Sequence, residues 1–527
     1  MSGERLTRLD ASFLQGENES APMNVGGVDV FAGPAPSTEQ FTEHLERRLH
    51  LLPRFRQRIA SVPLGLGRPR WTDDTKFRLS YHLRHTALPA PGGADQLSTL
   101  FARILEQPLD RGRPLWEMWL VEGLEGGRFA VLHKFHHTLV DGIASVSVIQ
   151  TIFDSQREPQ ATPAPRAWEP RRGPSRVRLL AGAAAERAVP PELVSSLGTL
   201  VRHPMEAAGR TAGALAGLGP VVGRGALRFA PRGPYNRKVG PHRCFAWQSE
   251  ALDDFKAVKD ALDGSLNDVV LAAVAGALGA HLRARGEDTA GLELQVFVPV
   301  ALRSSSGEDT GNEVSGLRVP LPVGMSDPLE RFQRINAAMQ ELKDSVEVVA
   351  GSTVIELSGL APPAVGDRLS QIGDVQRYVN LVVTNVPGPP STLYLLGREL
   401  EAVFPLVPLG ANLGLGVAIV SYANGIFFGF TSDPDIVPDV GELPSLLHAA
   451  LEELAEAAGV ELSAPVPGVG QRSAGGEPWP GYDEQTVAEI RKAVSQVDPV
   501  VLARVRAYER EHKDRKGVRE AVGDRPG

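Results

Sequence analysis

The sequence predicts an α/β protein with two lobes. Strand-like runs alternate with amphipathic helical patterns along most of the chain, which is typical of α/β folds. With 527 residues and a mass of 56.4 kDa, the chain is long enough for two domains, each with its own core. Between about residues 154 and 243 the sequence is rich in Pro, Gly, Ala and Arg and weakly periodic. This stretch is best interpreted as a crossover between the lobes.

In the first lobe, short strands and helices follow one another. Ser37-Thr38-Glu39-Gln40 is typical of a helix start, and Phe41 and Leu45 then recur on one face. Trp116 leads a strand into a Gly-rich turn, so that the next strand returns as a hairpin. The other elements expected here are strands at 25–31, 81–85 and 129–135 and helices at 96–107 and 143–153.

The second lobe continues the alternation. Ser265 or Asn267 is a plausible cap for a long apolar helix through Leu282. The other elements expected are helices at 252–262, 328–343 and 443–458 and strands at 294–300, 382–386, 413–422 and 426–431.

These patterns divide the chain into five parts. The expected boundaries are 1–155 for the N-terminal lobe, 156–243 for a basic crossover segment, 244–463 for the C-terminal lobe, 464–482 for a Pro- and Gly-rich linker, and 483–527 for a helical hairpin and tail. Asp483 and Asp498-Pro499 are suited to start the two helices of the hairpin. The hairpin is too small to be an enzyme by itself and is interpreted as an appended interaction or docking module.

Composition narrows the class of protein. A share of 42% hydrophobic and 22% charged residues is typical of a globular chain. The single cysteine, Cys244, excludes an internal disulfide framework and a cysteine-based metal cluster, which favours a reducing compartment. The N-terminus lacks the apolar core of a signal peptide, and no apolar run reaches the ~18 residues of a spanning helix. We therefore expect a cytoplasmic protein that meets a membrane only from the side.

Charge is unevenly distributed along the chain. Between Ala164 and Arg243 there are fourteen Lys or Arg against four acids, so this segment carries about +10 while the rest carries about −18. Nucleic acid is one possible partner for such a segment. An anionic lipid surface fits better, because the basic residues alternate with apolar ones, as in interfacial helices. A solvated, irregular linker fits the same residues equally well.

The chain is organised around the stretch Val131-Leu132-His133-Lys134-Phe135-His136-His137-Thr138-Leu139-Val140-Asp141-Gly142. The residues up to Phe135 form an apolar strand pattern, and helical spacing begins at Ile143. The two adjacent histidines therefore lie at a strand end, on the turn into a helix. At that turn Asp141 can cap the helix or hold an arginine from elsewhere, and Gly142 permits a backbone conformation that other residues resist.

Strand geometry separates the roles of the two histidines. Neighbouring strand residues point to opposite faces, so His137 shares a face with His133 and Phe135, while His136 shares one with Leu132 and Lys134. A joint two-histidine metal site is therefore disfavoured, and no metal is expected. One well-placed imidazole can accept and return a proton near neutral pH. On spacing alone, however, a histidine pair in an apolar strand is more often a hydrogen-bonded core feature.

The pattern His136-His137-xxx-Asp141-Gly142 resembles the HHxxxDG signature of the superfamily that includes chloramphenicol acetyltransferases and condensation domains. Six further motifs make residues 5 to about 460 similar to the bacterial wax ester synthase/diacylglycerol acyltransferase family. They are Leu9-Asp10-Ala11-Ser12-Phe13, Pro114-Leu115-Trp116-Glu117, Gly240-Pro241-His242-Arg243, Asn267-Asp268-Val269-Val270-Leu271-Ala272, Pro299-Val300-Ala301-Leu302-Arg303 and Thr384-Asn385-Val386-Pro387-Gly388-Pro389. The histidine motif alone specifies only acyl transfer, whereas the ordered set is much more specific.

The resemblance implies a two-lobed fold of the chloramphenicol-acetyltransferase type, with a tunnel between the lobes. It also implies a CoA-dependent O-acyltransferase that transfers a long-chain acyl group from acyl-CoA to diacylglycerol or to a long-chain alcohol. Acyl-CoA is then a co-substrate, no cofactor is needed, and no nucleic acid is involved. Peripheral association with a membrane or lipid droplet is expected, and the oligomeric state is left open.

The resemblance also assigns roles to single residues. His137 becomes the general base, His136 a supporting residue and Asp141 a structural anchor able to pair with Arg303. Gly142 is expected beside the substrate. Asn267 and Asp268 are expected to shape the substrate site at a helix start, and Thr384 or Asn385 to donate to the oxyanion. A purely structural role, capping helices and turning the chain, fits four of these residues at least as well: Asn267, Asp268, Thr384 and Asn385.

Two other functions remain open from the sequence. One is acylation of a secondary metabolite or of a carrier-bound group within the same superfamily. The other is a non-catalytic protein of lipid surfaces that retains the fold. The intact histidine motif argues against the second, because a scaffold has no need of a base there.

Overall fold

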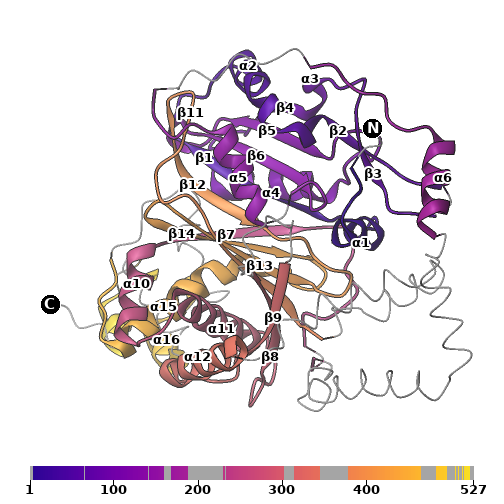
Figure 1. The fold of residues 1–527 in the computed structure, drawn as a ribbon. Coiled ribbons are helices and arrows are strands. Elements are labelled where there is room, and N and C mark those ends of the chain that lie inside the picture. The colour runs from indigo at the N-terminus through magenta and orange to yellow at the C-terminus, as the bar shows by residue number, and fades with distance from the viewer. Residues whose placement is uncertain are drawn as a thin grey trace, which may run out of the picture.

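A computed structural model describes most of the chain. The described residues are 4–63, 66–140, 142–158, 168–187, 230–231, 233–301, 314–344, 378–463, 482–494, 505, 508–509, 513 and 515–522. Within them the strands form two six-stranded sheets and one two-stranded sheet. Figure 1 shows the two large sheets in two lobes, one above the other, each with its own helices. The predicted α/β class and two-lobed arrangement are confirmed.

The sheet of the N-terminal lobe has the histidine strand near its centre. Its strands in order are β11 (Tyr394–Leu395), β12 (Arg398–Leu406), β1 (Asn24–Phe31), β6 (Phe129–His136), β5 (Trp116–Glu122) and β4 (Leu83–Ala87). β6 runs antiparallel to both β1 and β5, and every residue of β6 is buried. The small sheet pairs β2 (Gln57–Ala60) with β3 (Arg70–Asp73).

Side-chain caps mark the start of two helices of this lobe, α1 at Thr7 and α2 at Ser37. Ser37 caps α2, and Gln40 closes a capping box by accepting from the backbone N–H of Ser37. The helices are α1 (Arg8–Gly16), α2 (Thr38–Arg48), α3 (Leu79–His82), α4 (Ala94–Glu106) and α5 (Gly142–Ile152), and short 3-10 turns cover Leu49–Leu51, Pro53–Arg56 and Glu125–Gly127. The strand expected at 81–85 is half wrong, because the short helix α3 occupies its start.

The C-terminal lobe packs helices against a mixed sheet. Its strands in order are β7 (Cys244–Ala251), β14 (Gly425–Ser432), β13 (Leu415–Tyr422), β10 (Leu381–Pro387), β8 (Leu294–Ala301) and β9 (Val314–Leu321). Its helices are α10 (Leu252–Ala261), α11 (Leu266–Ala284), α12 (Pro328–Asp344) and α15 (Leu443–Ala458), with a 3-10 turn at Val440–Glu442. Ser265 is the N-cap of α11, which confirms one of the two expected caps, and α11 is buried from Asp268 to Leu282.

Two strands from the second half of the chain, β11 and β12, complete the sheet of the N-terminal lobe. β12 pairs antiparallel with β1, so that Val28 lies opposite Phe404. β12 also crosses β14 at backbone contact, since a Cβ on Gly429 would lie 1.8 Å from the carbonyl oxygen of Pro405. The ring of Phe404 stacks on Trp247 of β7, with centroids 5.1 Å apart. Residues 394–406, which the sequence assigns to the C-terminal lobe, therefore belong to the N-terminal sheet.

Part of the basic crossover segment lies on the N-terminal lobe. The ring of Trp168 receives the guanidinium of Arg56 at 4.7 Å, and α6 (Arg176–Arg187) follows. Leu179 of α6 is buried against Val62, whereas the side chain of Val177 is 75% exposed. The whole of the segment from 188 to 229 lies outside the described residues.

The C-terminal residues form a small core of their own. A 3-10 turn at Tyr482–Glu484, α16 (Val487–Val494) and α18 (Lys516–Ala521) enclose it. Its buried members are Tyr482, Ile490, Val494, Val505, Tyr508, Val518 and Val522. The first expected helix of the hairpin is confirmed, while most of the second, expected from Asp498, lies outside the described residues.

No single helix among the described residues is long and apolar enough to cross a membrane. α10 and α11 meet the length and composition together, but they are bent by 101° at the break between them.

Candidate active site at the histidine motif

The histidine pair lies where β6 ends and the chain turns into α5. The backbone N–H of His136 donates to Leu115, and that of His137 donates to Met23 at 2.8 Å. The N–H of Leu139 then donates back to the carbonyl of His136, which closes the turn. The predicted strand, turn and helix are confirmed. Both histidines are thus held by the backbone of neighbouring segments before any side chain contributes.

The ring of His136 is buried and its tautomer is fixed. Its exposed fraction is 1%, and its Nδ1 accepts a hydrogen bond from the backbone N–H of Thr138 at 3.0 Å. A nitrogen that accepts carries no proton, so the ring proton of the neutral imidazole is on Nε2. The ring therefore has no free basic nitrogen, which suits a supporting role.

A carboxylate that sequence reasoning missed faces this ring. Oε2 of Glu17 lies 3.5 Å from Nε2 of His136 and accepts from Nε and Nη2 of Arg111 at 3.1 and 2.5 Å. Burial alone would raise the pKa of Glu17, but the hydrogen bonds from His136 and Arg111 and the positive charge of Arg111 lower it to about 2. Glu17 is therefore ionised at any pH at which the protein works. The only sequence signal was a pair of acids, Glu17 and Glu19, in a polar stretch, which is not distinctive.

His137 is half-buried and lies against an aromatic ring. Phe13 of α1 stacks on the His137 imidazole with centroids 4.0 Å apart and planes 27° from parallel. Thr138 is tied to the same helix, because its Oγ1 donates to the carbonyl of Asp10 at 3.1 Å. Figure 1 shows α1 in indigo where the two lobes meet. The sequence did not predict α1 as a helix, although Asp10 and Phe13 belong to a motif of the resemblance.

The rest of β6 contains two further side chains that could be chemically active, His133 and Lys134. Nδ1 of His133 lies 2.9 Å from Oδ2 of Asp29, and both side chains are buried. Lys134 points to the other face, where its Nζ donates to the carbonyls of Ile104 and Gln107 at the end of α4. Lys134 therefore closes a helix end, a structural role.

In the C-terminal lobe, two of the expected substrate residues meet. Nδ2 of Asn385 on β10 donates to Oδ1 of Asn267 on α11, at 3.4 Å. Asp268 faces elsewhere: its Oδ2 accepts from the N–H of Ser265 at 2.8 Å and from Nδ2 of Asn336 at 3.0 Å. The side chain of Asp268 thus closes the start of α11 and ties it to α12.

Of the four remaining residues that we expected at the site, the structure describes two, Gly142 and Thr384. Gly142 is the first residue of α5, and Thr384 lies half-buried on β10 opposite Ala418. Asp141 and Arg303 lie outside the described residues, so their expected pairing stays a prediction.

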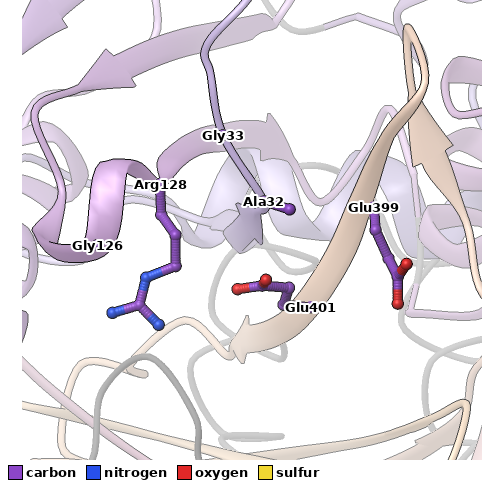
Figure 2. A pocket seen from close by; sticks show the side chains of 6 residues that line it. All are labelled: Ala32, Gly33, Gly126, Arg128, Glu399 and Glu401. Carbon is purple, nitrogen blue, oxygen red and sulfur yellow. The ribbon is translucent and has the colours of Figure 1, made fainter.

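A cavity of about 540 Å³ lies away from this motif. Figure 2 shows that Arg128, Glu399 and Glu401 line it together with backbone near Gly33 and Gly126. Arg128 precedes the first residue of β6, whereas His136 is the last, which separates the two places by roughly 23 Å of strand. The described His, Cys, Asp and Glu side chains form no group of three or more suited to a metal ion.

The two lobes are tied together near the histidine strand by a motif that the resemblance included. Nη2 of Arg243 donates to the carbonyl of Ser20 at 2.6 Å, and its backbone N–H donates to Oε1 of Glu106 at 3.0 Å. The hydroxyl of Ser98 on α4 also donates to the carbonyl of Phe245. The start of β7 is thereby held against α4 and against the loop between α1 and β1.

Comparison with known proteins agrees with this architecture. Residues 6–270 match the model of the wax ester synthase/diacylglycerol acyltransferase catalytic domain, and residues 310–455 match that of the family's C-terminal domain. Two proteins of Mycobacterium tuberculosis, each described as a probable diacylglycerol O-acyltransferase, are 33% identical to the chain. One match spans 85% of this chain and 95% of the relative, and the other spans 86% and 98%.

Solved structures give the same result. The wax ester synthase/diacylglycerol acyltransferase of Marinobacter aquaeolei VT8 superimposes with a TM-score of 0.60 and 26% identity, over 86% of this chain and 100% of that one. The first condensation domain of the calcium-dependent antibiotic synthetase has a TM-score of 0.54 and 17% identity, over 88% and 98%, which supports the fold alone. The chain belongs to the wax ester synthase/diacylglycerol acyltransferase family of O-acyltransferases.

Proposed function

We propose that this chain transfers a long-chain acyl group from acyl-CoA to the hydroxyl of diacylglycerol or of a long-chain alcohol, with His137 as the general base. One observation carries the proposal: a half-buried His137, stacked on Phe13, follows a buried His136 whose tautomer leaves it no basic nitrogen. Family membership supplies the acyl transfer. The difference between the two rings supports His137 as the single base, because only His136 is fixed in a tautomer without a basic nitrogen.

The reaction that we propose needs no covalent intermediate with the protein. A thioester is already activated, so the task is to make the hydroxyl oxygen nucleophilic. His137 takes the hydroxyl proton as the oxygen attacks the carbonyl carbon and an oxyanion forms. The carbon–sulfur bond then breaks, and the departing CoA thiolate takes the proton back from the imidazolium. The chain has no Gly-x-Ser-x-Gly elbow, and we propose no cofactor beyond acyl-CoA as co-substrate.

The oxyanion requires a donor, and the C-terminal lobe offers candidates. Asn385 uses one amide hydrogen for Asn267 and keeps a second, while Thr384 precedes it on the same strand. A donor of this kind contributes about 3 kcal/mol where it has been measured. We keep Asn385 or Thr384 as the proposed donor, Gly142 as a residue beside the substrate, and Asp141 with Arg303 as an anchoring pair. Asp268, by contrast, is committed to the start of α11.

We also propose that the chain meets a membrane or lipid droplet from the side, through the basic crossover segment. Within the described part of that segment, Arg176, Val177 and Arg178 of α6 are exposed. A cationic face that alternates with apolar side chains is attracted to anionic lipid. Val177 supplies the exposed apolar element there.

The proposed base is tested with purified protein, palmitoyl-CoA and either diacylglycerol or hexadecanol, by following release of the CoA thiol. The His137→Ala variant should lose at least about 100-fold in rate, since general base catalysis contributes this much. His85→Ala is the matched control, because His85 lies on the surface, paired with Glu122. Near-normal turnover of His137→Ala would refute the mechanism, and activity restricted to a carrier-protein thioester would refute the acyl donor.

A further inference from the structure

Glu17 contacts the ring of His136 and also Met23, whose carbonyl accepts the backbone N–H of His137. Its carboxylate is nearly buried, with 8% of the side chain exposed, and each oxygen has its own partners. Oε1 accepts from the backbone N–H of Met23 at 3.2 Å, and Met23 in turn accepts the backbone N–H of His137 through its carbonyl. Oε2 faces Nε2 of His136. One side chain thus reaches His136 directly and His137 through a single residue.

Arg111 holds this carboxylate in position. Its guanidinium donates twice to Oε2 of Glu17, and Nη2 also donates to the carbonyl of Leu14 at 3.0 Å. Leu14 is on α1, next to the Phe13 that stacks on the His137 ring. Arg111 therefore fixes the end of α1 and the carboxylate together, and with them the ring that covers His137.

We infer that Glu17, held by Arg111, is a positioning residue for His137. It touches no substrate in this scheme. It acts by fixing the tautomer of His136, the backbone at Met23 and the end of the helix that places Phe13. The inference rests on the proposed role of His137 as the base, and a base displaced by about 1 Å can cost up to 100-fold in rate.

The hydrogen-bonding pattern makes glutamine an informative replacement. Every partner of the Glu17 carboxylate is a donor: Met23 N–H on one oxygen, and Arg111 and His136 on the other. Glutamine has the same shape but only one acceptor oxygen, so its NH₂ group must face a donor on one side. Glu17→Asp keeps both acceptors and the charge but is shorter by one methylene.

The experiment measures kcat and KM for palmitoyl-CoA in full-length variants. We expect Glu17→Gln to lower kcat by about 10- to 100-fold while KM changes less than about twofold, and Glu17→Asp to recover part of the loss. Arg111→Lys, which keeps the charge but loses the two-pronged contact, should lower kcat about tenfold. Because Arg111 is half exposed, this variant remains a test even where Glu17→Gln does not fold.

Asp154→Asn is the matched control for general destabilisation. Asp154 is also a buried carboxylate of the N-terminal lobe paired with an arginine, Arg48, but it lies near β11 rather than at the histidines. We expect it to lower the melting temperature and leave kcat unchanged. A kcat of Glu17→Gln or Arg111→Lys within twofold of wild type, with His137→Ala inactive, would overturn the inference alone. Equal losses of kcat in Asp154→Asn and Glu17→Gln would overturn it as well.

Discussion

Single hydrogen bonds distinguish side chains that look alike in the sequence. The alternation of strand residues predicted that the two histidines differ in role, which stays a prediction; in the structure the N–H of Thr138 donates to Nδ1 of His136. The same strand contains Lys134, a lysine in an apolar run that could have had a catalytic role. Its contacts instead show a cation at the end of α4. The contacts of Lys134 join it to residues 27 and 30 positions earlier, which a motif does not record, whereas Thr138 lies only two residues from His136.

Lys134 gives the first prediction at this scale. Burial lowers the pKa of its ammonium group, but three oxygens surround it: those of Ile104 and Gln107, and Oε2 of Glu117 at 3.5 Å. Lys134→Met should lower the free energy of unfolding by about 2–4 kcal/mol, because it leaves these acceptors buried without a donor. Urea denaturation measures this. Lys256→Met, a change of an exposed lysine, should stay within about 0.5 kcal/mol, and an equal effect of both would contradict the assignment.

The raised pKa of His448 leads to a prediction of how the stability of the protein depends on pH. Burial opposes its charge, but hydrogen bonds to Glu250 and Glu452 raise its pKa from 6.5 to about 10. A raised pKa in the folded state means that the stabilisation is complete below about pH 6.5 and is lost as the pH rises through about 10. The melting temperature of wild type should therefore fall across this window, and that of His448→Gln should fall less. Parallel curves for the two proteins would contradict the prediction.

At the scale of elements, the sequence predicted what local patterns encode. β6, α5 and α11 have strong periodicity or clear caps, and all three were placed correctly. α1 was missed although Thr7 caps it, because its nine residues make fewer than about three turns and leave little room for a periodic pattern. β12 alternates in burial as a strand should, but nothing local indicates that its partner is β1. The site shows the same limit, since Glu17 and Arg111 meet only in the fold.

Gly429 tests the crossing of β12 over β14. A Cβ at this position would lie 1.8 Å from the carbonyl oxygen of Pro405, so one strand must move. Gly429→Ala should destabilise the protein by about 1–3 kcal/mol, as overpacking does, measured by chemical denaturation. Gly182→Ala in α6 is the control, since its Cβ would meet only Arg70, at 3.7 Å. Equal stability of the two variants would show that the strands are not in tight contact.

At the scale of the molecule, the chain combines a family enzyme with an additional module. The match to the second family model ends at residue 455. A separate small core lies beyond it and includes Tyr482, Ile490, Val505, Tyr508 and Val518. Glu509 is the polar centre of this module: it is fully buried and accepts from Tyr482 and from Arg515. The sequence predicted a separate unit here from its linker and helix starts. Its buried ion pair was not predicted.

The module should therefore be separable from the enzyme. Removal of residues 464–527 keeps the contact of Ser463 with Asp254 and all members of the two large cores. We expect the shortened chain to retain acyl transfer within about twofold of the full chain, as domains with separate cores do. CoA release and the melting temperature check this. A loss of more than tenfold would indicate that the module contributes to the active lobes.

β12 also has a consequence for how the protein is made. During synthesis, β1, β4, β5 and β6 leave the ribosome long before residues 398–406, so the first sheet waits with an open edge beside β1. Contacts between residues so distant in sequence form slowly. The nascent chain thus passes through a stage in which the histidine strand is present but its sheet is incomplete. Chaperone binding should concentrate in that interval.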